Sequence, residues 1–123
     1  MTQAPSTQAS DPDCLFCRIV SGQIPATIVE STGATVAFRD ITPVSPTHIL
    51  VVPRTHVADL GDAVAADPAI VTAVLSHAAA IAASQGLSGG YRVVINTGVD
   101  GGQTVQHLHA HLLAGRRHTW PPG

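Results

Sequence analysis

Apolar and polar positions along the chain follow two different periods, which predict helices in some segments and strands in others. Residues 68–85 show the clearest helical period, because apolar side chains recur there every three or four positions. Asp67 can cap that helix and Pro68 suits its first turn. Residues 14–20 predict a shorter helix. Strands are predicted at residues 27–31, 34–39, 47–52, 91–97 and 104–113.

Turn-forming residues separate these segments. Thr32-Gly33 predicts a hairpin turn, two prolines make residues 40–46 a loop, and residues 98–102 predict a tight glycine-rich loop. We expect residues 59–62 to form a solvated turn without a catalytic role. The order of helices and strands indicates an α+β domain with one long helix, a short N-terminal helix and a mainly antiparallel sheet.

The domain organisation follows from the length and from the first residues. Residues 1–13 are polar and lack a period, which predicts a disordered tail and leaves residues 14–123 as one domain. The chain shows neither an apolar run of about 18 residues nor a signal-peptide pattern. We therefore expect a cytoplasmic protein that has no membrane partner.

The charge balance narrows the classes of partner. The formal net charge of −2 argues against a protein that binds nucleic acid by neutralising phosphates. Charged residues make up only 11% of the chain, well below the roughly 25% of an average soluble protein. Either uncharged polar residues supply much of the surface, or a partner covers part of it.

Histidine is the unusual residue of this chain, and three of its seven histidines alternate with apolar residues. His107, His109 and His111 would share one face of a strand, while the aliphatic residue after each would point into the core. Burying three imidazoles together is costly unless they have partners. An imidazole with a pKa near 6.5 can attack phosphorus, and a neutral imidazole can bind a metal ion. The row therefore predicts a nucleophilic site or a metal site.

The glycine-rich loop before this row favours phosphate chemistry. Its glycines allow several backbone N–H groups to face one anion, and Gln103 and Thr104 add side-chain donors. Asn96 ends the preceding strand, where asparagine is unfavourable. It has either a polar task there or the role of a strand-end turn residue.

The remaining candidates are two cysteines and two isolated histidines. Cys14 and Cys17 form a C-x-x-C motif, whose spacing in the cytosol favours metal binding or redox chemistry, with two small core residues as the alternative. A thioredoxin-like pair is disfavoured, because the motif does not follow a strand in a βαβ unit. We expect His77 to be an ordinary exposed or edge histidine. We expect His118 to meet solvent or the distal part of a substrate.

The segment HLHAHLL at residues 107–113 resembles the histidine-triad motif, and the chain is similar to the histidine triad (HIT) superfamily, specifically its Hint branch. Further similar segments occur in the same order from Asp13 to Gly123: CLFCRIV at 14–20, GQIPA at 22–26, AFRDI at 37–41, PTHILVVP at 46–53, GYRVVIN at 90–96 and WPPG at 120–123. The resemblance implies a HIT-like fold of about five strands whose sheet continues across a homodimer.

The resemblance also implies an activity. The family's typical enzyme cleaves the P–N bond of purine nucleoside 5′-phosphoramidates, such as AMP-lysine, through a nucleotidyl-histidine intermediate. His109 would attack the α-phosphate, His111 and His48 would flank it, and Asp40 would hold the ribose hydroxyls. The residues implied for the purine slot are Leu15, Phe16, Ile19, Phe38 and Ile41, and those implied for phosphate or the leaving group are Asn96, Gly102, Gln103 and Thr104.

Two further features follow from the resemblance. It implies a structural zinc ion, with no organic cofactor, and the implied ligands are Cys14, Cys17, His56 and His107. It also implies that the tail at residues 115–123, which includes Trp120, lies near the active sites of the dimer. Thr104 stands where Hint proteins usually have serine, so the hydroxyl is kept.

Other functions stay open beside the phosphoramidase. A dinucleoside polyphosphate hydrolase, from a sister branch, fits the terminal WPPG segment less well. A nucleotidyltransferase is disfavoured because the branch related to galactose-1-phosphate uridylyltransferase carries glutamine at the third position of the triad, where this chain has His111. A purine-nucleotide-binding regulatory module would need no catalysis, which the intact His109 and its phosphate loop disfavour.

Overall fold

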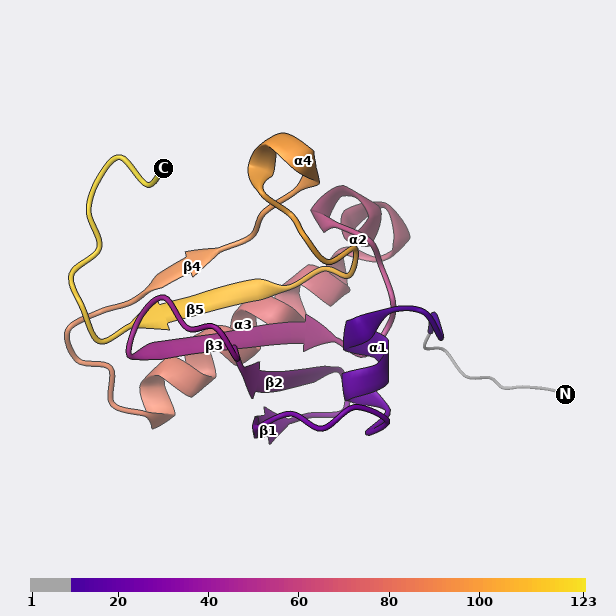
Figure 1. The fold of residues 1–123 in the computed structure, drawn as a ribbon, viewed down its shortest axis with the longest axis horizontal. Coiled ribbons are helices and arrows are strands. Elements are labelled where there is room, and N and C mark those ends of the chain that lie inside the picture. The colour runs from indigo at the N-terminus through magenta and orange to yellow at the C-terminus, as the bar shows by residue number, and fades with distance from the viewer. Residues whose placement is uncertain (1–9) are drawn as a thin grey trace, which may run out of the picture.

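Five strands form one antiparallel sheet in the order β1-β2-β3-β5-β4, as the computed structural model of the chain shows for residues 10–123 (Figure 1). The strands are β1 (Ile28–Ser31), β2 (Thr35–Arg39), β3 (Thr47–Pro53), β4 (Arg92–Val94) and β5 (Ala110–Ala114). The helices are α1 (Leu15–Val20), α2 (Leu60–Ala66), α3 (Pro68–Ser84) and the single turn α4 (Gly98–Gly101). The predicted α+β fold, with one long helix and a short N-terminal helix, is confirmed.

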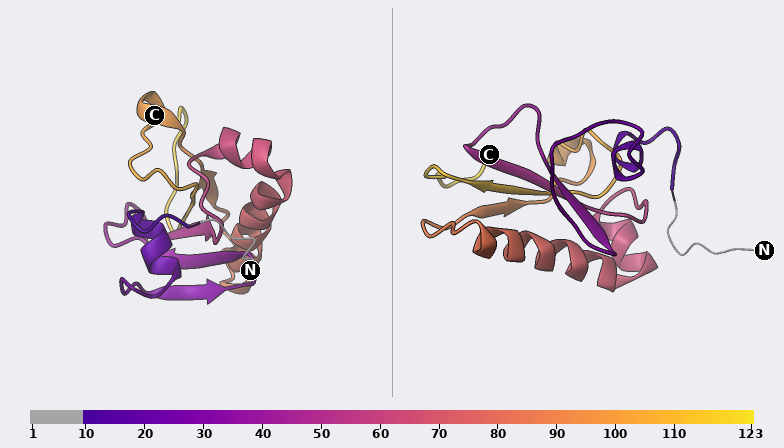
Figure 2. Two further views of the ribbon diagram at one scale, coloured as in Figure 1. Left: turned by 90° about the vertical axis from the view of Figure 1, so that its right-hand side faces the viewer. Right: turned by 90° about the horizontal axis from the view of Figure 1, so that it is seen from below.

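Both faces of the sheet are buried, each against a different helix. The long helix α3 lies along one face, and α1 lies on the other (Figure 2). Side chains of β2 and β3 alternate between the two: Ala37 and Val51 belong to the core under α3, whereas Phe38 and Leu50 belong to the core under α1. This two-sided burial explains why β3 is an almost continuous apolar run.

The long helix forms where its period predicts it. Asp67 is the N-cap, its side chain accepting a hydrogen bond from the backbone N–H of Ala69 at 3.0 Å, and Pro68 opens the first turn. The helix buries Val74 and Ile81 in the core, together with other apolar residues of the same face. The prediction of a helix over residues 68–85 is confirmed to within one residue.

Several local predictions were wrong. Residues 60–66 form α2 rather than a turn, because Asp59 caps it by accepting from the N–H of Asp62 at 2.9 Å. Residues 98–101 close into the helical turn α4. The last two strands are shorter than predicted, since β5 begins only at Ala110 and β4 covers only three residues.

His77 is another correction, because it is buried rather than exposed. Its Nδ1 lies 2.7 Å from Thr35 Oγ1 and its Nε2 lies 2.9 Å from Glu30 Oε1. The ring therefore links α3 to β2 and to β1, and its two polar atoms are satisfied in the interior.

Most of the predicted tail, residues 1–9, lies outside the described residues. At its end, the N–H of Asp11 donates to Cys17 Sγ at 3.4 Å, so this part of the chain contacts α1. Within residues 10–123, no helix has the length and apolar character to cross a membrane.

Candidate functional site

A cavity of about 250 Å³ opens between α1, the start of the loop after β2, and the segment before β5. It gathers nine of the residues predicted for catalysis or nucleotide binding: Leu15, Phe16, Ile19, Phe38, Asp40, Ile41, Thr104, His109 and His111. The side chains implied for the purine slot form its apolar wall. Ile24, Pro25, Ala26, Leu50 and Val105 extend this wall. The first four lie in the GQIPA and PTHILVVP segments of the resemblance, but none of the five had a predicted role in the site.

The histidine row keeps its predicted faces without being a continuous strand. Leu108, Ala110 and Leu112 are fully buried in the core under α3, as alternation predicts. The imidazoles of the row lie on the opposite side, but only His111 belongs to β5. Residues 104–109 are irregular, and there the N–H of Leu108 donates to the carbonyl of Val57 at 2.8 Å instead of joining the ladder.

His109 is held as a neutral ring with one nitrogen available for attack. Its Nδ1 lies 2.7 Å from the carbonyl oxygen of His107. A carbonyl only accepts, so Nδ1 carries the proton and Nε2 keeps its lone pair. Burial lowers the pKa of His109 below 6.5, although the hydrogen bond to that carbonyl and the Asp40 carboxylate oppose the shift. Phe16 packs edge-on against the ring, with centroids 5.1 Å apart.

His48 and His111 form a hydrogen-bonded pair beside His109. The N–H of Val44 donates to His48 Nδ1 at 3.1 Å, so the proton of neutral His48 sits on Nε2. That Nε2–H donates to His111 Nδ1 at 2.9 Å, which leaves the proton of His111 on its own Nε2. Burial above all, and then His109 and His48, lower the pKa of His111 to about 4. His111 is therefore neutral at pH 7.

Asp40 lies at the same corner. Its Oδ2 is 3.4 Å from His48 Nε2, and its Oδ1 accepts from the N–H of Thr42 at 2.7 Å. Asp40, His48 and His111 bring ligand-type atoms within 4.8 Å of one another. The nitrogens involved already bond to each other, so this group fits a proton-bearing network better than a metal ion.

The loop before the row is built differently from the prediction. The amide nitrogen of Gln103 donates to the carbonyls of Ala58 and Val105 at 2.7 and 3.0 Å, and its oxygen accepts from the N–H of Gly98 at 3.0 Å. Gln103 thus holds the loop in shape and presents no side-chain donor to a ligand. Gly102 has φ +86°, which favours glycine at the end of α4.

The other residues predicted for the nucleotide site do not line this cavity. Asn96 is half-buried after β4, Gly102 is exposed, and His48 is buried behind His111. Trp120 is exposed on the tail, with 81% of its surface accessible. The site also uses Val44, whose backbone alone takes part, so that no side-chain pattern could have indicated it.

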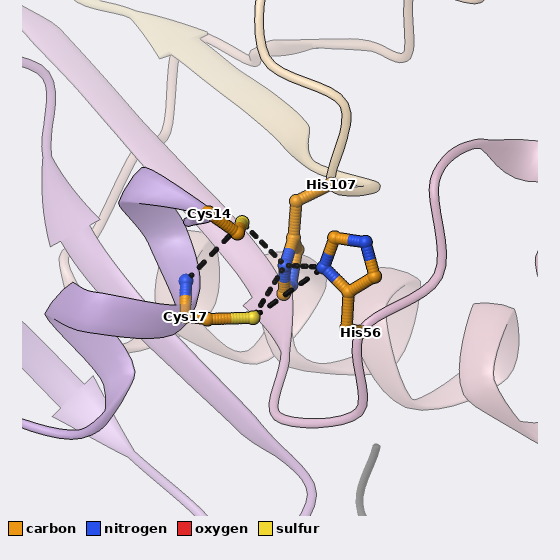
Figure 3. Close-up of side chains that lie close together, drawn as sticks. All are labelled: Cys14, Cys17, His56 and His107. Carbon is orange, nitrogen blue, oxygen red and sulfur yellow. Dashed lines mark hydrogen bonds between the residues drawn. The ribbon is translucent and has the colours of Figure 1, made fainter. Parts of the chain in front are cut away.

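A second cluster lies on the other side of Phe16. Cys14 and Cys17 come from α1, and they point toward His56 and His107 (Figure 3). Their four ligand atoms lie within 4.8 Å of one another. His107 Nδ1 is 3.4 Å from Cys14 Sγ, 3.5 Å from Cys17 Sγ and 3.2 Å from His56 Nδ1.

This donor set fits a tetrahedral metal ion. Bonds of about 2.0–2.3 Å to nitrogen and sulfur would separate tetrahedral ligands by about 3.3–3.8 Å, which is close to the distances in the cluster. His107 Nε2 lies 2.8 Å from the carbonyl oxygen of Pro53 and donates to it, so the lone pair of Nδ1 points into the cluster. Burial above all lowers the pKa of His107 to about 4, which keeps the ring neutral and able to ligate.

Comparison with known proteins decides the family. The HIT domain matches residues 21–118. The chain belongs to the HIT domain family. For this HIT protein, the predicted resemblance to the histidine triad superfamily is confirmed, and so is the HIT-like fold with one five-stranded antiparallel sheet.

Relatives of this HIT protein match it along most of their length. It is 42% identical to the 14 kDa zinc-binding protein of Zea mays, over 98% of this chain and 96% of that relative. It is 41% identical to the adenylylsulfatase HINT1 of Arabidopsis thaliana, over 93% of this chain and 79% of that relative. The crystal structure of a HIT family hydrolase from Legionella pneumophila Philadelphia 1 superimposes with a TM-score of 0.86 at 47% identity, covering 90% of this chain and 100% of that one.

Proposed function

We propose that this HIT protein is a nucleotide hydrolase that cleaves the P–N bond of purine nucleoside 5′-phosphoramidates, AMP joined to an amine. The observation that carries the proposal is the state of His109 at the cavity wall. Its Nδ1–H is bonded to the His107 carbonyl, so the lone pair of Nε2 is available to phosphorus. The homologous HIT family hydrolase from Legionella and the Arabidopsis adenylylsulfatase support hydrolysis of a nucleotide.

The cavity suits a purine nucleotide. Its apolar wall offers stacking and van der Waals contact to a flat base, and such contact distinguishes adenine from guanine only weakly. Asp40 lies at the rim, where its carboxylate would accept hydrogen bonds from ribose hydroxyls. Thr104 borders the same space, and its hydroxyl would donate to a phosphate oxygen.

In the proposed reaction, Nε2 of His109 attacks the α-phosphorus and the P–N bond breaks. The leaving nitrogen takes up a proton as it departs, because an amine anion is a poor leaving group. The Nε2–H of His111 would donate a hydrogen bond to a phosphoryl oxygen and so stabilise the charge that develops there. Water then cleaves the bond between phosphorus and His109, which releases AMP and restores the neutral imidazole.

Two other hydrolytic substrates remain as alternatives. In a dinucleoside polyphosphate, the same nucleophile would displace a phosphate leaving group. The name of the Arabidopsis relative, adenylylsulfatase, suggests an adenylyl sulfate as the second alternative. The third alternative is a purine-nucleotide-binding module without catalysis. Such a module would not explain why the lone pair of His109 Nε2 is available.

The deciding experiment measures AMP release from an adenosine 5′-phosphoramidate by the wild-type protein and by His109→Ala. We expect turnover by the wild type and a loss of roughly three orders of magnitude or more in His109→Ala. Faster release from a dinucleoside polyphosphate or an adenylyl sulfate would transfer the proposal to that substrate. Binding of AMP without release from any of the three would end it.

We also propose that the Cys14, Cys17, His56 and His107 cluster holds a structural zinc ion. The chemistry of the donor set supports it, and the Zea mays relative is named a zinc-binding protein. In this role the ion would tie α1 to the segment that carries the histidine row. We propose no organic cofactor.

Finally, we propose that the protein is a homodimer whose sheet continues from one chain to the other. β4 is an edge strand that pairs only with β5 within the described residues. Such an edge leaves backbone hydrogen-bonding groups available to a second copy.

A further inference from the structure

The start of the C-terminal tail is hydrogen-bonded to the loop before β3. The Nε–H of Arg116 donates to the carbonyl of Val44 at 3.1 Å, across 72 positions in the sequence. Gly115 has φ +93°, and a Cβ at this position would lie 2.7 Å from Cβ of Pro46. The tail and the loop therefore approach each other so closely that a residue other than glycine at position 115 would displace Pro46.

The peptide units of Val44 therefore connect the tail to the histidine pair. Its carbonyl accepts from Arg116, and its N–H donates to His48 Nδ1 at 3.1 Å. His48 Nε2 in turn forms a 2.9 Å hydrogen bond with His111 Nδ1, so the position of the His48 ring affects that of His111. Three consecutive hydrogen bonds thus link an exposed arginine to the wall of the cavity.

The bond from Val44 determines which nitrogen of His48 carries the proton. While it is present, Nδ1 must accept and the proton sits on Nε2, where it can be donated to His111 Nδ1. The groups that face His48 Nε2 are His111 and the Asp40 carboxylate, 2.9 and 3.4 Å away, and His109 lies beyond His111 with ring centroids 5.0 Å apart. If the loop shifts, Nδ1 can take the proton, and the bond to His111 can reverse.

We propose that Arg116 is a positioning residue for this site: by holding the carbonyl of Val44, it keeps His48 in the Nε2–H form that donates to His111. Its effect on turnover rests on the hydrolase function proposed above. Its effect on the tautomer of His48 does not. Arg117, the next residue, is exposed and contributes to this arrangement only through its backbone carbonyl, which accepts from Arg116 Nη1 at 3.2 Å.

The experiment compares Arg116→Ala with Arg117→Ala as the matched control and Arg116→Lys as the rescue. Long-range ¹H–¹⁵N NMR of the histidine rings reports which nitrogen of His48 carries the proton, and kcat and KM are measured on the phosphoramidate. We expect Arg116→Ala to populate the Nδ1–H form of His48 and to lower kcat about fivefold, with KM little changed, as the loss of one charged hydrogen bond permits. Arg117→Ala should keep the wild-type tautomer and rate, and Arg116→Lys should restore most of both because its ammonium can reach the same carbonyl.

A second variant tests the same contact without removing the arginine. Gly115→Ala places a methyl group against Pro46 and should displace the loop, with the same change at His48. An unchanged His48 tautomer in both Arg116→Ala and Gly115→Ala would overturn the proposal, whatever happens to the rate. If the wild-type protein turns over no substrate, the proposed hydrolase fails, and the tautomer measurement still decides the role of Arg116.

Discussion

At the scale of single residues, the cavity brings together histidines whose ring nitrogens are held by hydrogen bonds to backbone groups or to another ring. His48 Nε2 also lies 3.4 Å from the Asp40 carboxylate. Burial disfavours the protonated forms of His109 and His111. The proposed attack on phosphorus needs the neutral form of His109, so the lowered pKa favours that form below the ordinary pKa of histidine.

This arrangement makes stability depend on pH through His111. Its pKa is about 4 in the folded protein, against 6.5 for an ordinary histidine such as the same residue in the unfolded chain. Between these values the unfolded chain binds a proton that the folded protein does not, so the free energy of unfolding falls as pH drops from 6.5 toward 4. The ring is only partly buried, which reduces the effect to on the order of 1 kcal/mol.

Urea unfolding of the wild type and of His111→Gln at pH 7.0 and pH 4.5 measures this contribution. We expect the wild type to lose more stability on acidification than the variant, by the amount given above. His107, whose pKa is also about 4, is present in both proteins, so its contribution to acid sensitivity cancels in the comparison. The metal content of each sample must be measured as well. Equal losses in the two proteins would contradict the assigned environment of His111.

The residues that could be predicted from the sequence are those with a local signature. The alternation of the histidine row and the spacing of Cys14 and Cys17 identified the two clusters that the structure assembles. His77 and Gln103 could not be interpreted in this way. Their partners lie 42 and 45 positions away, so their burial depends on the tertiary fold rather than on neighbours in the chain.

At the scale of elements, α1 connects the proposed metal cluster to His109, the proposed nucleophile. It carries both cysteines, and between them Phe16 packs against His107 and His109 with ring centroids 6.0 and 5.1 Å away. The carbonyl of His107 in turn holds His109 Nδ1. A change in the Cys14, Cys17, His56 and His107 cluster should therefore reach the His109 ring through one short helix.

Metal removal tests this connection. We expect treatment with a chelator to lower the midpoint of thermal unfolding by roughly 5–10 °C and to speed hydrogen exchange in α1, because four ligands would lose their common partner. Native and denaturing mass spectra of the same sample would give the metal content, as a mass excess that denaturation removes.

Cys17→Ser provides the control for that treatment. Without one sulfur ligand, the variant should show the lowered midpoint from the start and no further change on adding the chelator. A wild-type sample that carries no metal, or one whose α1 exchanges equally with and without it, would contradict the role proposed for the cluster.

Element boundaries were predictable where a period is long and failed where it is short. The seventeen-residue helix α3 shows many repeats of its pattern, whereas the seven residues of α2 include only two turns. The alternation from His107 onward reports correctly which side chains face the core. It does not report whether the backbone pairs with a neighbour: pairing with β3 begins only at Ala110, and pairing with β4 begins one residue later, at His111.

At the scale of the whole molecule, the low share of charged residues corresponds to an exposed apolar strip on α3. The exposed face of α3 carries Leu75, Ala79 and Ala83, which share one side of the helix. Ala79 and Ala83 border a shallow groove with Tyr91, at the start of β4. This apolar strip therefore meets the start of β4, which is one of the two edge strands of the sheet.

We therefore predict that two copies associate through the β4 edge and this strip of α3. Light scattering coupled to size exclusion should give roughly 25 kDa for the wild type, twice the 12.6 kDa of one chain. Ala79→Arg places a charge in the middle of the strip and should shift the mass to that of the monomer, whereas Ala65→Arg, on the exposed side of α2, should leave the dimer intact.

Because Ala79 is exposed in the single chain, the substitution Ala79→Arg should not unfold the protein, and circular dichroism would verify this. A wild-type mass of one chain at micromolar concentration, or a dimer that survives Ala79→Arg, would show that the apolar strip serves another purpose.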